Sequence, residues 1–275
     1  MYSKILTVQD ISCVGQCSLT VALPILSACG TECCILPSAV LSTHTGGFTG
    51  FTFRDLTDDI PSIQAHWEKE KIHFDAVYTG YLGSEKQILY MKNLFSSPVL
   101  SGAKIIVDPA MGDNGKLYKG FDLSYARSMG NLCHSADVIL PNITEACFMT
   151  GMPYQEKYDY AYLEKLLNAL FELQPRHVIL TGVSLDEDST GVITATPDSY
   201  SYYKHKKIHK SFHGTGDIYS SAFTGALMNG KDLERSARIA ADYTVSCIEK
   251  TIDDPDHWYG VKFELALNDL MMMLR

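Results

Sequence analysis

Residues 137–146, "DVILPNITEA", carry the pattern that decides the fold. The run "DVIL" is apolar after its first residue, and a proline and several polar residues follow it at once. The same arrangement occurs at Lys104–Val107, "KIIV", and at residues 177–180, "HVIL". Strands that are apolar throughout are typical of a parallel sheet that helices cover on both faces, because neither face of such a strand meets water.

Strand-like and helix-like segments alternate along most of the chain. The expected strands are residues 4–9, 33–40, 75–79, 104–107, 137–140 and 177–180, with an antiparallel pair at 191–195 and 200–208. The expected helices are residues 18–28, 63–71, 84–95, 124–133, 161–173, 215–228, 233–250 and 262–273. This alternation predicts an α/β fold with a mostly parallel central sheet and helices on both faces.

The composition argues against several classes of protein. The chain has 275 residues, a hydrophobic fraction of 46% and a net charge of −9, so a general nucleic-acid or membrane-surface role is not expected. The basic, aromatic stretch at 200–210 is interpreted as a solvated edge strand. No signal segment or membrane span is expected, and eight scattered cysteines favour reduced thiols in the cytoplasm over a zinc site or disulfides.

Polar residues and glycines follow the predicted strands at the points where the strands end. In an open parallel sheet, ligands bind beyond the carboxyl ends of the strands. We therefore expect one site to be formed by these residues: Asp10, Gly80, Tyr81, Asp108, Asn142, Glu145, Thr181 and Gly182.

The segment 214–217, "GTGD", is the one phosphate-type loop, since GxxxxGK[ST] and a GxGxxG entering a helix are absent. Gly214 and Gly216 permit a tight turn, and the N–H groups of Thr215, Gly216 and Asp217 would start a helix and attract an anion. Asp217 could accept a proton from a hydroxyl that attacks a phosphoryl group. The alternative is an ordinary first-turn carboxylate, which stabilises a helix by about 0.3–1 kcal/mol.

Two further motifs supply oxygen ligands of the kind that Mg²⁺ prefers. "VDPAMGD" contains Asp108 and Asp113, and "LPNITEA" contains Asn142 and Glu145. Asn-x-x-Glu at the start of a helix puts both side chains on one face. The alternatives are a simple turn at Asp108 and a helix N-terminal charge at Glu145.

Seven motifs occur in an order that resembles the ribokinase superfamily, and most closely the pyridoxal (pyridoxine, pyridoxamine) kinases. They are "VQDISCVGQCS", "STHTGG", "TGYLGS", "VDPAMGD", "LPNITEA", "ILTG" and "FHGTGD". The resemblance implies a ribokinase-like three-layer sandwich and a single kinase domain over residues 1–275, without a separate large lid domain. It also implies ATP-dependent phosphorylation of the 5′-hydroxymethyl group of B6 vitamers, with Mg²⁺ and K⁺ as candidate ions and a homodimer as the assembly.

The resemblance assigns roles residue by residue. Asp217 would be the general base, and Gly214, Thr215 and Gly216 would form the anion hole. Asp113 and Glu145 would act on Mg²⁺, partly through water, whereas Asp108 and Thr181 would contact a monovalent cation and phosphate. The implied nucleotide-binding residues are Asp108, Asp113, Asn142, Glu145, Thr181, Gly182, Val183 and Thr215, with residues 111–120 as a flap over the phosphates. The implied residues for the organic substrate are Asp10, His44, Thr45 and Tyr81.

Asp10 departs from the family pattern, in which a serine stands at this position and meets the pyridine nitrogen. A carboxylate here could hold that nitrogen protonated and change the preference among vitamers. The alternative is an aspartate that caps the following turn.

Two other functions remain open on the sequence. A hydroxymethylpyrimidine (phosphate) kinase of the same superfamily also phosphorylates a small hydroxymethyl aromatic compound. A non-catalytic pyridoxal phosphate-binding protein could use the same fold, although the intact "GTGD" argues against it.

Overall fold

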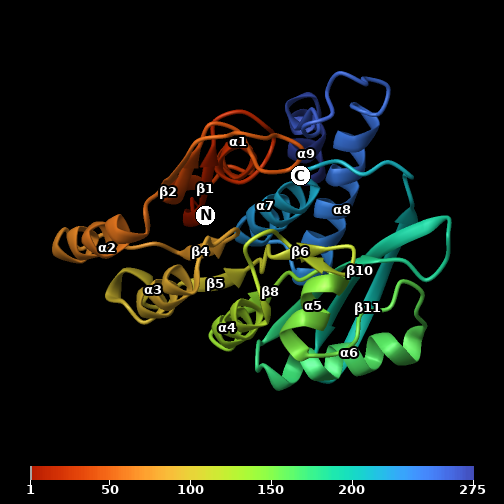
Figure 1. Ribbon diagram of the computed structural model, residues 1–275, viewed down its shortest axis with the longest axis horizontal. Helices are drawn as coiled ribbons and strands as arrows, with labels where there is room; N and C mark the ends of the chain where they lie inside the picture. Colours follow the sequence, from red (N-terminus) through yellow and green to blue (C-terminus); the bar gives the residue numbers. More distant parts are fainter. Residues whose placement is uncertain (1) are drawn as a thin grey trace.

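The structure is a computed structural model that describes residues 2–275 and has a nine-stranded sheet at its centre (Figure 1). The strands lie in the order β11-β10-β9-β8-β5-β4-β1-β2-β3. Pairing is parallel from β2 through β1, β4, β5 and β8 to β9, and antiparallel for β3, β10 and β11 at the two edges. Their bounds are β1 Lys4–Ser12, β2 Glu32–Leu41, β3 Phe53–Asp55, β4 Ala76–Thr79, β5 Lys104–Val107, β8 Val138–Ile139, β9 His177–Val183, β10 Ser189–Thr196 and β11 Ser199–Lys206.

Helices cover both faces of this sheet, which makes three layers (Figure 1). One face carries α1 (Leu19–Ala28), α7 (Thr215–Met228), α8 (Leu233–Glu249) and α9 (Leu267–Met273). The other carries α2 (Ile60–Lys69), α3 (Glu85–Phe95), α4 (Leu123–Cys133), α5 (Ile143–Thr150) and α6 (Tyr160–Glu172). The neighbouring β5 residues Ile106 and Val107 belong to opposite hydrophobic clusters, so the apolar runs serve both faces as predicted. Among the helices of residues 2–275, none has the length and apolar character needed to cross a bilayer.

The predicted fold class is confirmed, and the differences are local. β5 and α7 have the predicted bounds, and β11 is an edge strand. β1 and β9 run three residues further than predicted, to Ser12 and Val183, because pairing with their neighbours continues through polar and glycine positions. The predicted helix 262–273 begins instead as a 3-10 turn at Phe263–Ala266.

The glycine-rich segment 111–120 contains a hairpin that the sequence analysis missed. Its strands are β6 (Gly112–Asp113) and β7 (Lys116–Leu117). Asn114 and Gly115 between them both have positive φ, 50° and 73°. Asn-Gly is the strongest short-range hairpin signal, so the sequence did contain the information.

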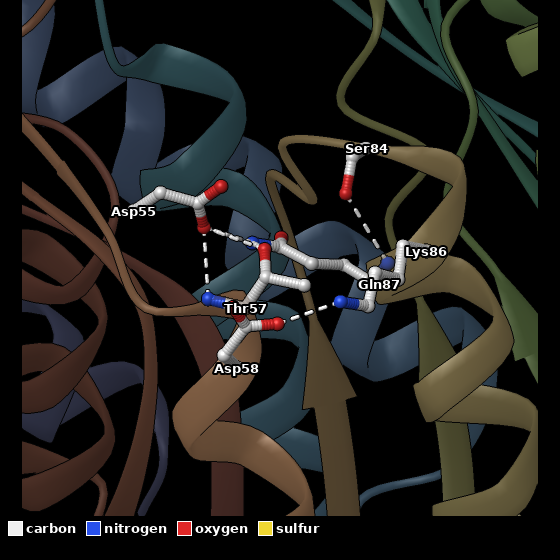
Figure 2. A network of polar contacts seen from close by, with 6 residues as sticks. All are labelled: Asp55, Thr57, Asp58, Ser84, Lys86 and Gln87. Carbon is white, nitrogen blue, oxygen red and sulfur yellow. Dashed lines mark hydrogen bonds and ion pairs between the residues drawn. The ribbon is translucent and has the colours of Figure 1, made fainter.

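A buried glutamine, Gln87, holds the turn that follows β4, and Figure 2 shows its contacts with Asp55 and Thr57. Gln87 Nε2 donates to Thr57 Oγ1 (2.8 Å) and to the Ser38 carbonyl (3.1 Å), while its Oε1 accepts from the Gly83 N–H (2.7 Å). A buried amide is costly unless it is hydrogen-bonded, and this one is bonded on both ends. Through Gln87 in α3, the network therefore connects three parts of the chain: β2, the segment that follows β3, and the turn that carries Tyr81.

Helices α1 and α7 approach each other closely at a glycine. A Cβ atom on Gly225 would lie 2.4 Å from Cys29 Sγ and 2.7 Å from Cys29 Cβ. Real Cβ atoms are never so close to their neighbours, so the absence of a side chain sets the spacing of the two helices. The position of the first turn of α7, which begins with "GTGD" residues, depends on that spacing.

We predict that Gly225→Ala lowers the free energy of unfolding by about 1–3 kcal/mol, because it overpacks this contact. Gly130→Ala is the matched control: it also lies inside a helix, but its Cβ would meet ordinary contacts of 3.5–3.6 Å. The control should be neutral or stabilising by about 0.5–1 kcal/mol. Urea unfolding measures both, and Cys29→Ala should restore part of the loss in a double variant. A Gly225→Ala protein as stable as the wild type would contradict this packing.

Candidate active site

The predicted site residues lie in the last residues of the parallel strands or just beyond their carboxyl ends, in the order in which the strands lie in the sheet. Those predicted for the organic substrate come from β2, β1 and β4: His44, Thr45, Asp10 and Tyr81. Those predicted for the nucleotide come from β5, β8 and β9: Asp108, Asp113, Asn142, Glu145, Thr181, Gly182 and Val183. The sheet therefore separates the two groups into adjoining halves.

The first turns of α7 contact both halves. Asp217 Oδ2 accepts the backbone N–H of Ser18, on the β1 side, at 3.0 Å. One turn later, Ser220 Oγ donates to Asp108 Oδ2, on the β5 side, at 2.6 Å. Asp217 consequently stands where the two halves meet.

The turn before α7 leaves backbone N–H groups free. Gly214 is the N-cap with φ 77° and offers no side chain to cap them, so the N–H groups of Thr215, Gly216 and Asp217 start the helix without intrahelical acceptors. A Cβ on Gly214 would lie 1.7 Å from the Gln16 carbonyl oxygen, so only glycine fits. A Cβ on Gly216 would meet nothing within 4 Å, which leaves room for an anion beside the N–H groups.

Three carboxyl groups meet here with no basic partner. Burial raises the pKa of Asp108 and of Glu145, and repulsion from Asp108 raises that of Glu145 further. Burial raises the pKa of Asp217 to about 7; the Ser18 N–H opposes the rise, and the charges of Asp108 and Asp10 add to it. Within residues 2–275 no Lys or Arg lies at ion-pair distance from any of the three. Such a cluster favours cations brought by ligands.

The arrangement fits a magnesium ion that is held mainly by phosphates and water. The described part of the chain has no group of three or more side chains arranged to hold a metal ion. The Glu145 carboxylate already accepts hydrogen bonds from the backbone N–H groups of Met111 (3.0 Å) and Asn142 (2.9 Å). The Asp113 carboxylate accepts hydrogen bonds from the backbone N–H (2.8 Å) and the side-chain Nδ2 (3.0 Å) of Asn114. Mg²⁺ usually keeps several waters and needs only one or two protein carboxylates, a number that Glu145 and Asp113 could supply.

Asp10 is buried inside β1 and does not open a turn, since the strand continues to Ser12. Its carboxylate accepts two side-chain hydroxyls, Ser18 Oγ at 2.6 Å and Ser12 Oγ at 2.8 Å. Burial raises its pKa despite these bonds. The capping alternative is therefore not supported.

The loop after β2 is held by His44, whose ring is buried. Its Nδ1 accepts from the Gly46 N–H (3.0 Å), so Nε2 carries the proton and donates to the Tyr259 carbonyl (2.8 Å). The neighbouring Thr45 is exposed and free to meet a ligand.

The turn after β4 places Tyr81 at the β1 side of the site. Burial, and then the nearby charge of Asp10, raise the pKa of Tyr81 to about 12. Its ring lies 5.5 Å from that of Phe121, which stacks on Tyr125 at 3.8 Å. Phe121 follows the β6–β7 hairpin, so the segment 111–120 ends against the substrate half.

The nucleotide half ends at β8 and β9. Asn142 caps α5, where its Oδ1 accepts from Glu145 N (2.9 Å), and it also donates to the Gly112 carbonyl (2.9 Å). Thr181 N donates to the Pro141 carbonyl (2.9 Å), and Gly182 has a positive φ of 68° with open space around it. The Val183 side chain is in the core, so only its backbone could face a nucleotide.

Two serines at the site carry no sequence signal that would single them out. Ser18 joins Asp10 to Asp217, and Ser220 holds Asp108. A serine at the N-cap of a helix, like Ser18, or inside a helix, like Ser220, is too common to stand out. The motif "VGQCS" included Ser18, but its role depends on the approach of α7.

A second hollow lies at the opposite end of the sheet and has a volume of about 970 Å³. Its lining includes Asp75 and Asp137, just before β4 and β8, and none of the predicted site residues. Both carboxylates accept backbone N–H groups at strand starts, from Lys4 and Ile105 (2.8 Å each). Those residues stabilise the sheet, and the hollow offers no comparable chemistry.

The chain matches a known family over most of its length. The family model described as phosphomethylpyrimidine kinase matches residues 23–260. The pyridoxine/pyridoxal/pyridoxamine kinase of Bordetella avium is 26% identical over 260 residues, 90% of this chain and 85% of that protein.

Solved structures agree with this assignment. A Bacteroides thetaiotaomicron protein described as a phosphomethylpyrimidine kinase, crystallised with pyridoxal, is 37% identical with a TM-score of 0.92, over 98% of this chain and 96% of that one. Pyridoxal kinase from Lactobacillus plantarum is 32% identical with a TM-score of 0.90, over 99% of this chain and 98% of that one. The chain therefore belongs to the phosphomethylpyrimidine kinase family, within the ribokinase-like group that includes the pyridoxal kinases.

Proposed function

We propose that this protein transfers the terminal phosphoryl group of ATP to the 5′-hydroxymethyl group of pyridoxal, pyridoxine or pyridoxamine, in salvage of pyridoxal 5′-phosphate. The observation that carries the proposal is the start of α7, where Asp217 and free N–H groups stand between the two halves of the site. Pyridoxal in the crystals of the Bacteroides relative supports the choice of substrate.

Asp217 would act as the general base. Its Oδ2 holds the Ser18 N–H, and no described donor contacts its Oδ1, which can take the proton of the 5′-hydroxyl. The oxygen of the 5′-hydroxyl would then attack the terminal phosphorus of ATP while the bond between that phosphorus and ADP breaks. The N–H groups of Thr215 and Gly216 and the positive end of α7 would stabilise charge on the transferred group.

Ions would bind on the nucleotide half. Asp113 and Glu145 would hold Mg²⁺, partly through water, and Asp108 and Thr181 would hold a monovalent cation such as K⁺. When bound, Mg²⁺ neutralises charge on the phosphates. The unpaired carboxylates support this assignment, because buried charges need a counter-charge.

The β6–β7 hairpin would cover the phosphates and exclude water. It is fastened to α5 by Gly115 N, which donates to Thr144 Oγ1 at 2.9 Å, and by Asn142. Tyr118, just after β7, feels the charges of Glu145 and Asp113, which add to burial in raising its pKa. The hairpin thus stands beside the acidic cluster.

The second candidate is a hydroxymethylpyrimidine (phosphate) kinase, favoured by the description of the family model. A non-catalytic binding protein is disfavoured by the intact turn and base. We also propose that residues 1–275 work as one domain, in a homodimer, and in the cytoplasm, where the eight cysteines, all unpaired in the structure, would remain reduced.

Replacing the base should abolish turnover without loss of nucleotide binding. We expect Asp217→Asn to lower kcat by about two to four orders of magnitude, since it removes the proton acceptor but keeps an oxygen for the Ser18 N–H. A coupled ADP assay measures turnover, and titration calorimetry with an ATP analogue measures binding. Retained turnover would exclude Asp217 as the base.

The pH dependence follows from the ionised form of the base. Asp217 works when deprotonated, and burial raises its pKa to about 7. We expect kcat/KM for the vitamer to rise about tenfold per pH unit below 7 and then level off. If kcat/KM falls at the same pH with all three vitamers, the titrating group is on the protein and not on the substrate. A kcat/KM that stays constant down to pH 5 would contradict the assignment of Asp217 as the base.

The substrate panel tests both the function and Asp10. Wild-type protein should turn over the three vitamers faster than hydroxymethylpyrimidine; the reverse order would favour the second candidate.

Asp10→Ser should change the ratios of kcat/KM among the vitamers by about tenfold, because a charged hydrogen bond to the ring nitrogen becomes a neutral one. Unchanged ratios would show that Asp10 does not read the ring.

A further inference from the structure

One residue contacts both carboxylates at the two ends of the predicted acceptor pocket. Ser18 Oγ donates to Asp10 Oδ1 at 2.6 Å, and Ser18 N donates to Asp217 Oδ2 at 3.0 Å. Ser18 is itself buried. A single residue thus links, through its hydroxyl and its backbone N–H, the group predicted to meet the ring with the group predicted to take the proton.

The backbone of Ser18 shows that this link overrides local preference. Its φ of 55° and ψ of −134° are unusual for a residue with a side chain. Ser18 is also the N-cap of α1, where serine normally bonds the N–H groups of the first turn. Here the side chain makes no such bond and contacts Asp10 instead.

The surrounding packing holds Ser18 against α7. The Gln16 carbonyl lies so close to Gly214 that no Cβ would fit there, and Cys29 at the end of α1 likewise leaves no room for a Cβ on Gly225 in α7. Contacts at both ends of α1 therefore set the distance between the Ser18 N–H and Asp217. The bond to Oδ2 leaves Oδ1 for the substrate proton.

We infer that Ser18 is a positioning residue that couples Asp10 to Asp217: its hydroxyl, bonded to Asp10, fixes the position of its backbone N–H, which holds Asp217, so that the ring end of the substrate and the reacting hydroxyl are aligned through one residue. The inference rests on the proposed function. It differs from the assignment of Asp10 alone, because it requires that loss of the Ser18 hydroxyl disturb the base.

The test compares Ser18 with Ser12, which donates to the other oxygen of Asp10 and has no bond to Asp217. Either loss removes one hydroxyl hydrogen bond from the Asp10 carboxylate, but only the Ser18 variants act on a residue that also holds Asp217. We expect Ser18→Ala and Ser18→Gly each to lower kcat about tenfold or more at a pH on the plateau, with KM for ATP changed by less than about twofold. Ser12→Ala should lower kcat by less than about twofold.

Ser18→Gly distinguishes loss of the hydroxyl from strain in the backbone, because it removes the hydroxyl while glycine adopts a φ of 55° freely. If only Ser18→Ala loses activity, strain explains the effect and the inference is wrong. It is also overturned if Ser12→Ala costs as much as the Ser18 variants, or if both Ser18 variants keep more than half of the wild-type kcat. Loss of cooperative thermal unfolding in both would show a structural role and overturn it as well.

A double-variant cycle completes the test. Once Asp10→Ser has removed the carboxylate, Ser18→Ala should lower kcat by less than a further twofold. Full additivity of the two effects would contradict the coupling. No vitamer turnover by the wild-type protein would instead refute the proposed function, so the two failures are distinct.

Discussion

The close approach of α7 to α1 and to the loop before it is the constraint on which the site depends. At Gly214 and Gly225 no side-chain atom would fit, and these two contacts bring the start of α7 against Gln16 and its last turn against Cys29. As a result the free N–H groups of α7 and the Asp217 carboxylate lie between the two halves of the strand ends. A wider spacing would separate Asp217 from Ser18 and Ser220 from Asp108.

A second constraint is electrostatic. Asp10, Asp108, Glu145 and Asp217 are gathered in a small, mostly buried region, and burial raises the pKa of each. An arrangement like this costs stability in the free protein, because buried negative charges without counter-charges are unfavourable. Under the proposed function, cations brought by the ligands would offset this cost, and the raised pKa of Asp217, about 7, would suit a general base near neutral pH.

Much of the site could be predicted from residues near strand ends, because the carboxyl ends of parallel strands meet at one edge of the sheet. Asp108, Asn142 and Tyr81 were found in this way. The Asn114-Gly115 pair is a hairpin signal that predicts the β6–β7 turn. Ser18 could not have been found, because its contacts join positions 10 and 217, which only the folded chain brings together.

The sequence by itself determined the alternation of strands and helices, the burial of the central strands on both faces and the residue types available at the strand ends, since these follow from local periodicity and turn chemistry. Only the tertiary structure decided which strands are neighbours, how far β1 and β9 extend, and which oxygen of Asp217 accepts the Ser18 N–H. Those features depend on packing between distant segments, where the contact of two helices at a glycine matters more than any local preference.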